Sequence, residues 1–70
     1  MPAILNLETA AGYVRDYHAA EGRPSVKIES ADWSAEIDGV DVTAVIPSAS
    51  GDIVAKWTVW IERGELYGEW

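Results

Sequence analysis

Residues 52–70 read DIVAKWTVWIERGELYGEW, two segments of alternating polar and apolar residues joined at Arg63-Gly64. Alternate side chains of a β-strand point to opposite faces, so each segment has one apolar side and one polar side. The pattern predicts a β-hairpin with one face toward a core and one face away from it. The predicted inward stripe is Ile53, Ala55, Trp57, Val59 and Ile61 in the first strand, and Leu66, Gly68 and Trp70 in the second.

The residues before this hairpin continue the alternation. Val40 to Ile46 and Trp33 to Ile37 are two such runs, and Asp38-Gly39 between them is a strong hairpin signal. Val26 and Ile28 alternate in the opposite phase, so the pattern slips near Ser30. Either a turn there separates two strands, or one strand carries a bulge.

Residues 7–21 have helical periodicity instead. Asn6 is a suitable N-cap, and Gly22 followed by Pro24 is a suitable stop. Gly12 lowers helix propensity, and we expect it to allow close approach to the sheet. The apolar positions are Leu7, Ala10, Ala11, Val14, Tyr17 and His18, of which Leu7, Val14 and Tyr17 are expected to cover the sheet.

These elements predict an α+β fold, with one N-terminal helix packed on one face of a four- or five-stranded antiparallel meander. The 70 residues are expected to form a single domain, 1–70, because a chain of this length supports one small core. Ile46-Pro47 and residues 52–66 are similar in hairpin pattern to the closing strands of PepSY-type domains and of some gas-vesicle accessory proteins. That resemblance implies a helix followed by a meander, and it carries over no functional motif.

The chain is strongly acidic, with 12 Asp and Glu against 5 Lys and Arg and a formal charge of −7. This charge repels phosphate backbones and anionic membranes, so we expect no direct nucleic acid binding and no membrane binding. No apolar run approaches the ~20 residues that cross a bilayer, and no export signal is apparent. With no cysteine, the expected location is cytoplasmic.

The sequence favours a protein that is not an enzyme. His18 is the only histidine, and helical spacing from Val14 predicts a packing role for it. Glu36 and Asp38 share a strand face but have no predicted pocket to separate their pKa values. We therefore expect no catalytic residue, no cofactor and no metal site.

The face opposite the inward stripes is the candidate binding surface. It combines acids with large aromatics, which solubility alone does not require. The predicted partner-binding residues are Glu36, Asp41, Trp60, Glu62, Glu65, Tyr67 and Glu69.

These residues predict a small acidic protein-binding module that docks on a basic protein surface. Its most specific form is a phage-type inhibitor that engages a defence or nucleic-acid enzyme by imitating nucleic acid. One alternative is that the acidity mainly keeps a small protein soluble and that Trp60 and Tyr67 only stabilise their hairpin. Another is a homo-oligomeric structural or accessory protein, for example a homodimer, that uses the same face or the C-terminal edge strand.

Overall fold

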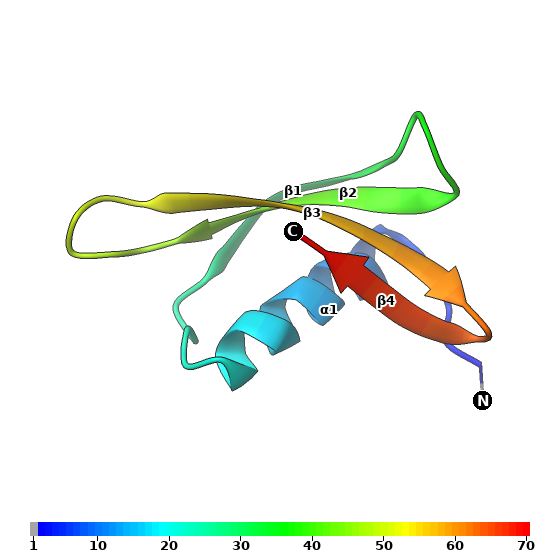
Figure 1. Cartoon of the computed structure of the whole chain (residues 1–70), viewed down its shortest axis with the longest axis horizontal. Helices are drawn as coiled ribbons and strands as arrows, with labels where there is room; N and C mark the ends of the chain where they lie inside the picture. Colours follow the sequence, from blue (N-terminus) through cyan, green and yellow to red (C-terminus); the bar gives the residue numbers. More distant parts are fainter. Residues whose placement is uncertain (1) are drawn as a thin grey trace.

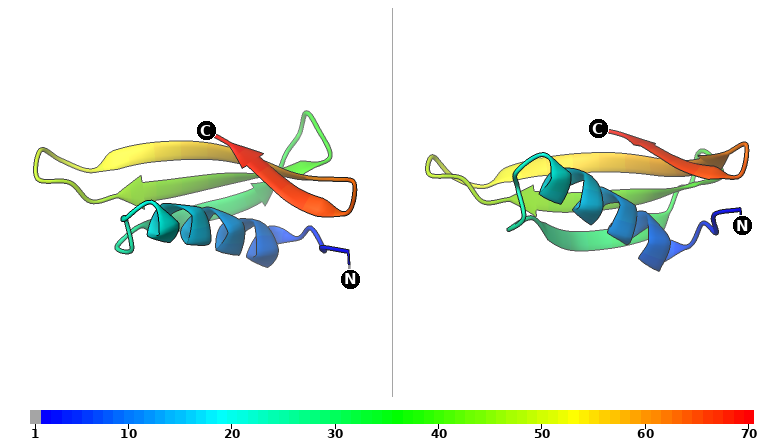
Figure 2. Two further views of the ribbon diagram at one scale, coloured as in Figure 1. Left: turned by 60° about the horizontal axis from the view of Figure 1, so that its bottom comes forward. Right: turned by 90° about the horizontal axis from the view of Figure 1, so that it is seen from below.

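A computed structural model describes residues 2–70. Helix α1 (Leu7–Ala20) precedes strands β1 (Lys27–Trp33), β2 (Gly39–Ile46), β3 (Ile53–Glu62) and β4 (Glu65–Glu69). The strands form one antiparallel sheet in the order β1-β2-β3-β4, and α1 lies across one face of it (Figures 1 and 2). The predicted α+β fold is confirmed, with four strands.

Helix α1 begins at the predicted cap. The Asn6 side chain accepts a hydrogen bond from the Thr9 amide at 2.8 Å, and Thr9 Oγ1 accepts one from the Asn6 amide at 2.9 Å. The helix ends at Ala20, one residue before the predicted end, and Gly22 follows with φ of 82°. A Cβ at Gly12 would meet nothing within 4 Å, so the expected close approach to the sheet at Gly12 is wrong.

The core lies between α1 and the helix-facing side of β2 and β3. From the helix it takes Ala10 and Val14, with His18 buried beside them. Leu7 and Tyr17 are 37% and 38% exposed, so these two predicted core residues lie at its boundary. The sheet contributes the buried residues Val40, Val42, Ala44, Ile46, Ala55, Trp57 and Val59.

Strand β1 contains a bulge and ends earlier than predicted. The register of β1 on β2 shifts between Ile28 and Ser30. The slip in the sequence pattern near Ser30 is therefore a bulge within one strand and not a turn between two strands. The predicted strand to Ile37 and the tight Asp38-Gly39 turn are wrong. Ser34 Oγ accepts hydrogen bonds from the amides of Glu36 and Ile37, at 3.2 and 3.4 Å, and these local bonds compete with strand pairing.

Residues 34–38 therefore form a loop, here called the 34–38 loop. The Ser34 amide closes it by donating to the Gly39 carbonyl at 2.8 Å. Gly39 is the first residue of β2 and not part of a two-residue turn. The loop rises on the side of the sheet away from α1 (Figure 1).

The turn of the β3–β4 hairpin matches its prediction, but Ile53, Ile61 and Trp70 of the predicted inward stripe are exposed. Arg63 and Gly64 have φ of 53° and 78°, as the two central residues of a type I′ turn require. The register pairs Trp60 with Tyr67 and Glu62 with Glu65. The predicted outward side of this hairpin therefore faces away from α1.

Candidate functional site

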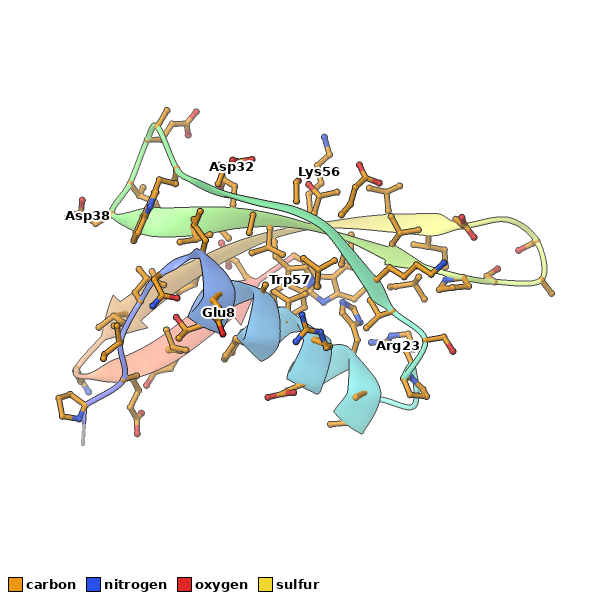
Figure 3. All side chains as sticks on the ribbon, turned by 180° about the vertical axis from the view of Figure 1, so that it is seen from behind. Glu8, Arg23, Asp32, Asp38, Lys56 and Trp57 are labelled. Atoms are coloured by element: carbon orange, nitrogen blue, oxygen red, sulfur yellow. The ribbon has the colours of Figure 1, made fainter. Side chains whose placement is uncertain are left out.

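The outer face is the side of the sheet that α1 leaves uncovered. Figure 3 shows Asp32 and Lys56 directed away from the helix, whereas Trp57 points toward it. Strand alternation and the cross-strand register assign the remaining residues to this face. In the half near the 34–38 loop they are Asp32, Asp41, Thr58, Trp60, Glu62, Glu65, Tyr67 and Glu69.

Trp60 and Tyr67 form an aromatic pair on the outer face. Their ring centroids are 6.4 Å apart and their planes differ by 22°, a stacked arrangement. The Tyr67 hydroxyl donates a hydrogen bond to Glu65 Oε2 at 3.3 Å. The negative charge of Glu65, followed by desolvation, raises the pKa of Tyr67 above its ordinary value of 10.0. The hydroxyl therefore stays protonated and keeps its role as donor at neutral pH.

Acidic residues lie directly opposite one another on this face. Asp32 pairs with Asp41 across β1 and β2, and Glu62 pairs with Glu65 across β3 and β4. Like charges in such cross-strand positions destabilise a sheet. The stability of the fold therefore does not explain these acids.

The outer face also contains a concavity of about 600 Å³ between the 34–38 loop and strands β2 to β4. Gly39 makes room for the loop, because a Cβ there would lie 2.8 Å from the Val59 carbonyl oxygen and 3.1 Å from Ile37 Cδ1. The residues that surround the concavity include Glu36, Ile37, Asp38, Asp41, Thr58, Trp60, Ile61 and Glu69. We call it the outer concavity.

The structure gathers the predicted binding residues in two adjoining places. Asp41, Trp60 and Glu69 line the outer concavity, while Glu62, Glu65 and Tyr67 lie beside it on the β3–β4 hairpin. Glu36 also lines the concavity, but from the 34–38 loop, so its predicted position on an outer strand face is wrong.

Asp38 and Thr58 line the outer concavity, and Asp32 lies beside Asp41 on the same face, but none of the three is among the predicted partner-binding residues. Thr58 Oγ1 lies 3.4 Å from Asp41 Oδ1, a long hydrogen bond in which the hydroxyl is the donor. The register indicates Asp32 and Thr58, because Thr58 stands between Asp41 and Glu69 in one cross-strand row. Asp38 lies in the 34–38 loop, so its predicted position on an outer strand face is wrong. The bulge in β1 sets the remaining pairing of Asp32 with Asp41.

His18 belongs to the opposite, helix-covered side, and its predicted packing position is confirmed by full burial. Trp57 Nε1 donates to His18 Nε2 at 3.0 Å, and Arg23 Nε lies 3.0 Å from His18 Nδ1. A neutral imidazole has one nitrogen lone pair, so it accepts from only one of these donors at a time. Burial, followed by the charge of Arg23, lowers the pKa of His18, and the charge of Glu21 opposes that shift.

Aromatic rings surround His18. The Trp57 and Trp70 rings stack at 5.8 Å, and Tyr17 meets Trp57 edge to face at 4.9 Å. Arg23 lies over the Trp70 ring at 5.9 Å. His18 therefore acts as a packing residue and hydrogen-bond acceptor within an aromatic cluster.

Across residues 2–70, no three His, Asp or Glu side chains are placed to hold a metal ion. Nor does the described part of the chain contain a helix of the length and apolar character that crossing a bilayer needs. Comparison with protein-family models, curated proteins and solved structures gave no significant match.

Proposed function

We propose that this chain is a small non-enzymatic module that binds another protein, with its acidic outer face against a basic surface. The observation that carries the proposal is the pairing of like charges, Asp32 with Asp41 and Glu62 with Glu65, on the uncovered face. A cationic partner would convert this repulsion into attraction, so the arrangement that weakens the free sheet would strengthen a complex.

The free-energy cost of these like-charge pairs matters because so short a chain has little stability. A directly opposed like-charge pair costs on the order of 0.2–1 kcal/mol, while a core of this size leaves about 3–5 kcal/mol of net stability. Two such pairs therefore consume a noticeable share of the stability. Partner binding supplies a reason for their presence that folding does not.

Charge is distributed unevenly along the outer face. Lys27 and Lys56 pair with Val45 and Thr43, away from the 34–38 loop. The acids listed above occupy the other half of the face. A basic partner would therefore be oriented toward the half that holds the aromatic pair and the outer concavity.

The aromatic pair supplies the apolar contact that charge alone lacks. Tyr67 is 38% exposed and stacks on Trp60, so a partner can cover their rings without rearranging the sheet. Tryptophan and tyrosine surrounded by polar groups are typical of the residues that dominate protein interfaces.

In its more specific form, the proposal is that the partner is a nucleic-acid-binding enzyme and that the chain acts as a phage-type inhibitor. Outer-face acids on neighbouring strands stand ~4.8 Å apart, which favours a two-dimensional field of negative charge. Such a field would occupy a groove that otherwise binds phosphates. Competition between the chain and nucleic acid for the purified partner tests this form.

Retention of partners from a lysate of the source organism tests the proposal. The matched variants are Glu62→Gln with Glu65→Gln on the outer face, and Glu8→Gln with Asp16→Asn on exposed helix positions. Both remove the same charge, so a general effect of acidity would weaken retention equally.

We expect the outer-face variant to lose a protein that the wild type and the helix variant retain at low salt, and high salt to release it. The retained protein is then identified and its binding repeated with purified components. Equal loss in both variants, or no loss in either, contradicts the proposal. Sedimentation of the chain alone that shows a stable dimer through the outer face would favour the homo-oligomeric alternative.

A further inference from the structure

We infer that the outer concavity receives an arginine side chain of the partner, with its guanidinium between Asp41 and Glu69 and against the ring of Trp60. This inference rests on the proposed function and specifies which group of the partner the site recognises. It also specifies a position on the outer face where the contact is made.

The concavity has the size and boundaries of a binding site. Its volume of about 600 Å³ lies within the range of roughly 300–1,000 Å³ typical of small-molecule pockets. The 34–38 loop forms one wall, held by the bonds of its amides to Ser34 Oγ and by the Ser34–Gly39 backbone bond. Gly39 lets Ile37 lie over the sheet, so the wall depends on a glycine at that position.

The lining matches a long cationic side chain. Ile37 and Trp60 offer apolar surface for an aliphatic stem, and Asp41 and Glu69 offer carboxylates for its head. None of the described residues that line the concavity is Lys or Arg. A cation that entered would therefore meet carboxylates from more than one strand and no opposing positive charge.

The register favours a planar, branched cation over a point charge. Asp41 and Glu69 lie on either side of Thr58 in one cross-strand row, so their backbones stand ~9.6 Å apart, two strand spacings. Trp60 follows Thr58 on the same face, ~6.7 Å along β3. A guanidinium has five donors in one plane, so it can reach toward carboxylates on both sides while its face lies on an indole. An ammonium lacks that geometry.

The test is a titration of the ¹⁵N-labelled full chain, followed by amide and indole N–H signals. The probes are acetyl-Gly-Arg-Gly-amide and the same peptide with lysine or with citrulline, which keeps the shape of arginine without its charge. We expect the arginine peptide to shift the signals of Gly39, Thr58 and the Trp60 indole. The lysine peptide should bind more weakly, and the citrulline peptide should leave these signals in place.

Matched variants separate the concavity from general charge. Asp41→Asn and Glu62→Gln each remove one negative charge from the outer face, but only Asp41 lines the concavity. Asp41→Asn is expected to weaken arginine binding about 3-fold, in the range of exposed ion pairs, with a smaller effect of Glu62→Gln. Trp60→Leu is expected to weaken it about 2- to 5-fold, as loss of an exposed cation–π contact predicts. Glu69→Gln repeats the test if Asp41→Asn disturbs the dispersed spectrum of the folded chain.

The outcomes distinguish this inference from the proposed function. Equal binding of arginine and lysine, together with equal effects of Asp41→Asn and Glu62→Gln, overturns the arginine site but leaves a charge-driven outer face. Shifts confined to the helix-covered side overturn both ideas. When neither cationic peptide moves any outer-face signal, the arginine site is overturned, and the retention experiment decides the proposed function separately.

Discussion

Acidification should destabilise the chain through His18, which is fully buried against Trp57. Both ring nitrogens face donors, Trp57 Nε1 and Arg23 Nε, each at 3.0 Å. An imidazolium has a proton on both nitrogens and no lone pair, so protonation would remove the acceptor that Trp57 uses. Of the charged neighbours, Arg23 opposes protonation and Glu21 favours it. The rings of Tyr17, Trp57 and Trp70 surround His18.

The sign of the effect follows from the lowered pKa of His18 in the folded chain. Between the lowered pKa of the folded chain and the ordinary value of 6.5, the unfolded chain binds more protons than the folded chain, so acid favours unfolding in this range. The stabilising contribution of His18 to the free energy of unfolding is fully present above pH 6.5 and decreases as the pH falls. The decrease approaches about 1.4 kcal/mol per pH unit, or about 2 kcal/mol at pH 5 when the folded imidazole stays neutral throughout.

Urea unfolding followed by tryptophan fluorescence at pH 5, 6 and 7 measures this contribution. The control is His18→Gln, whose amide oxygen can accept from Trp57 but which does not titrate. The free energy of unfolding of the wild type should fall toward pH 5 by up to about 2 kcal/mol more than that of the variant. Parallel pH profiles, or a steeper fall in the variant, would show that His18 is not the source of the acid sensitivity.

Three further substitutions test the packing and the charge pairs by urea unfolding. Gly68→Ala should cost about 1–3 kcal/mol, because its Cβ would lie 2.7 Å from Tyr13 Cε1, and an unchanged stability would contradict that packing. Gly12→Ala should stabilise the chain by about 1 kcal/mol, since its Cβ meets open space within a helix; a loss of stability would show a contact the structure lacks. Asp32→Lys should stabilise it by about 0.2–1 kcal/mol and weaken partner retention, whereas the equal charge change Glu29→Lys in the bulge should not stabilise it. If both changes have the same effect on stability, the opposed charges are not the cause.

Local patterns predicted most of the fold because they act over few residues. Alternation assigned Trp57 to the core and Trp60 to the outer face, and Arg63-Gly64 predicted its turn since both residues adopt positive φ. Asn6 marked the start of the helix through a side-chain bond to the nearby Thr9 amide. Each of these predictions needed only neighbours along the chain or directly across a strand.

The predictions that failed concern features that depend on competing hydrogen bonds or on tertiary contacts. Residues 34–37 alternate like a strand, but Ser34 Oγ captures the amides of Glu36 and Ile37 and turns the chain into a loop. Gly12 was expected to approach the sheet closely, but a Cβ there would meet open space, whereas Gly68 lies against aromatic rings. The outer concavity follows from the loop, so no pattern within a single strand could predict it.

Cross-linking from matched positions on opposite faces tests whether the outer face binds a basic protein. Tyr67 on the outer face and Tyr17 on the helix are each 38% exposed, so exposure does not favour either site. Each is replaced in turn by photoreactive benzoylphenylalanine and illuminated in a lysate of the source organism. We expect a cross-link at 67 to a protein with a basic surface, lost at high salt and absent at 17. Cross-links only at 17, equal cross-links at both sites, or a cross-link at 67 solely to a second copy of the chain would contradict it.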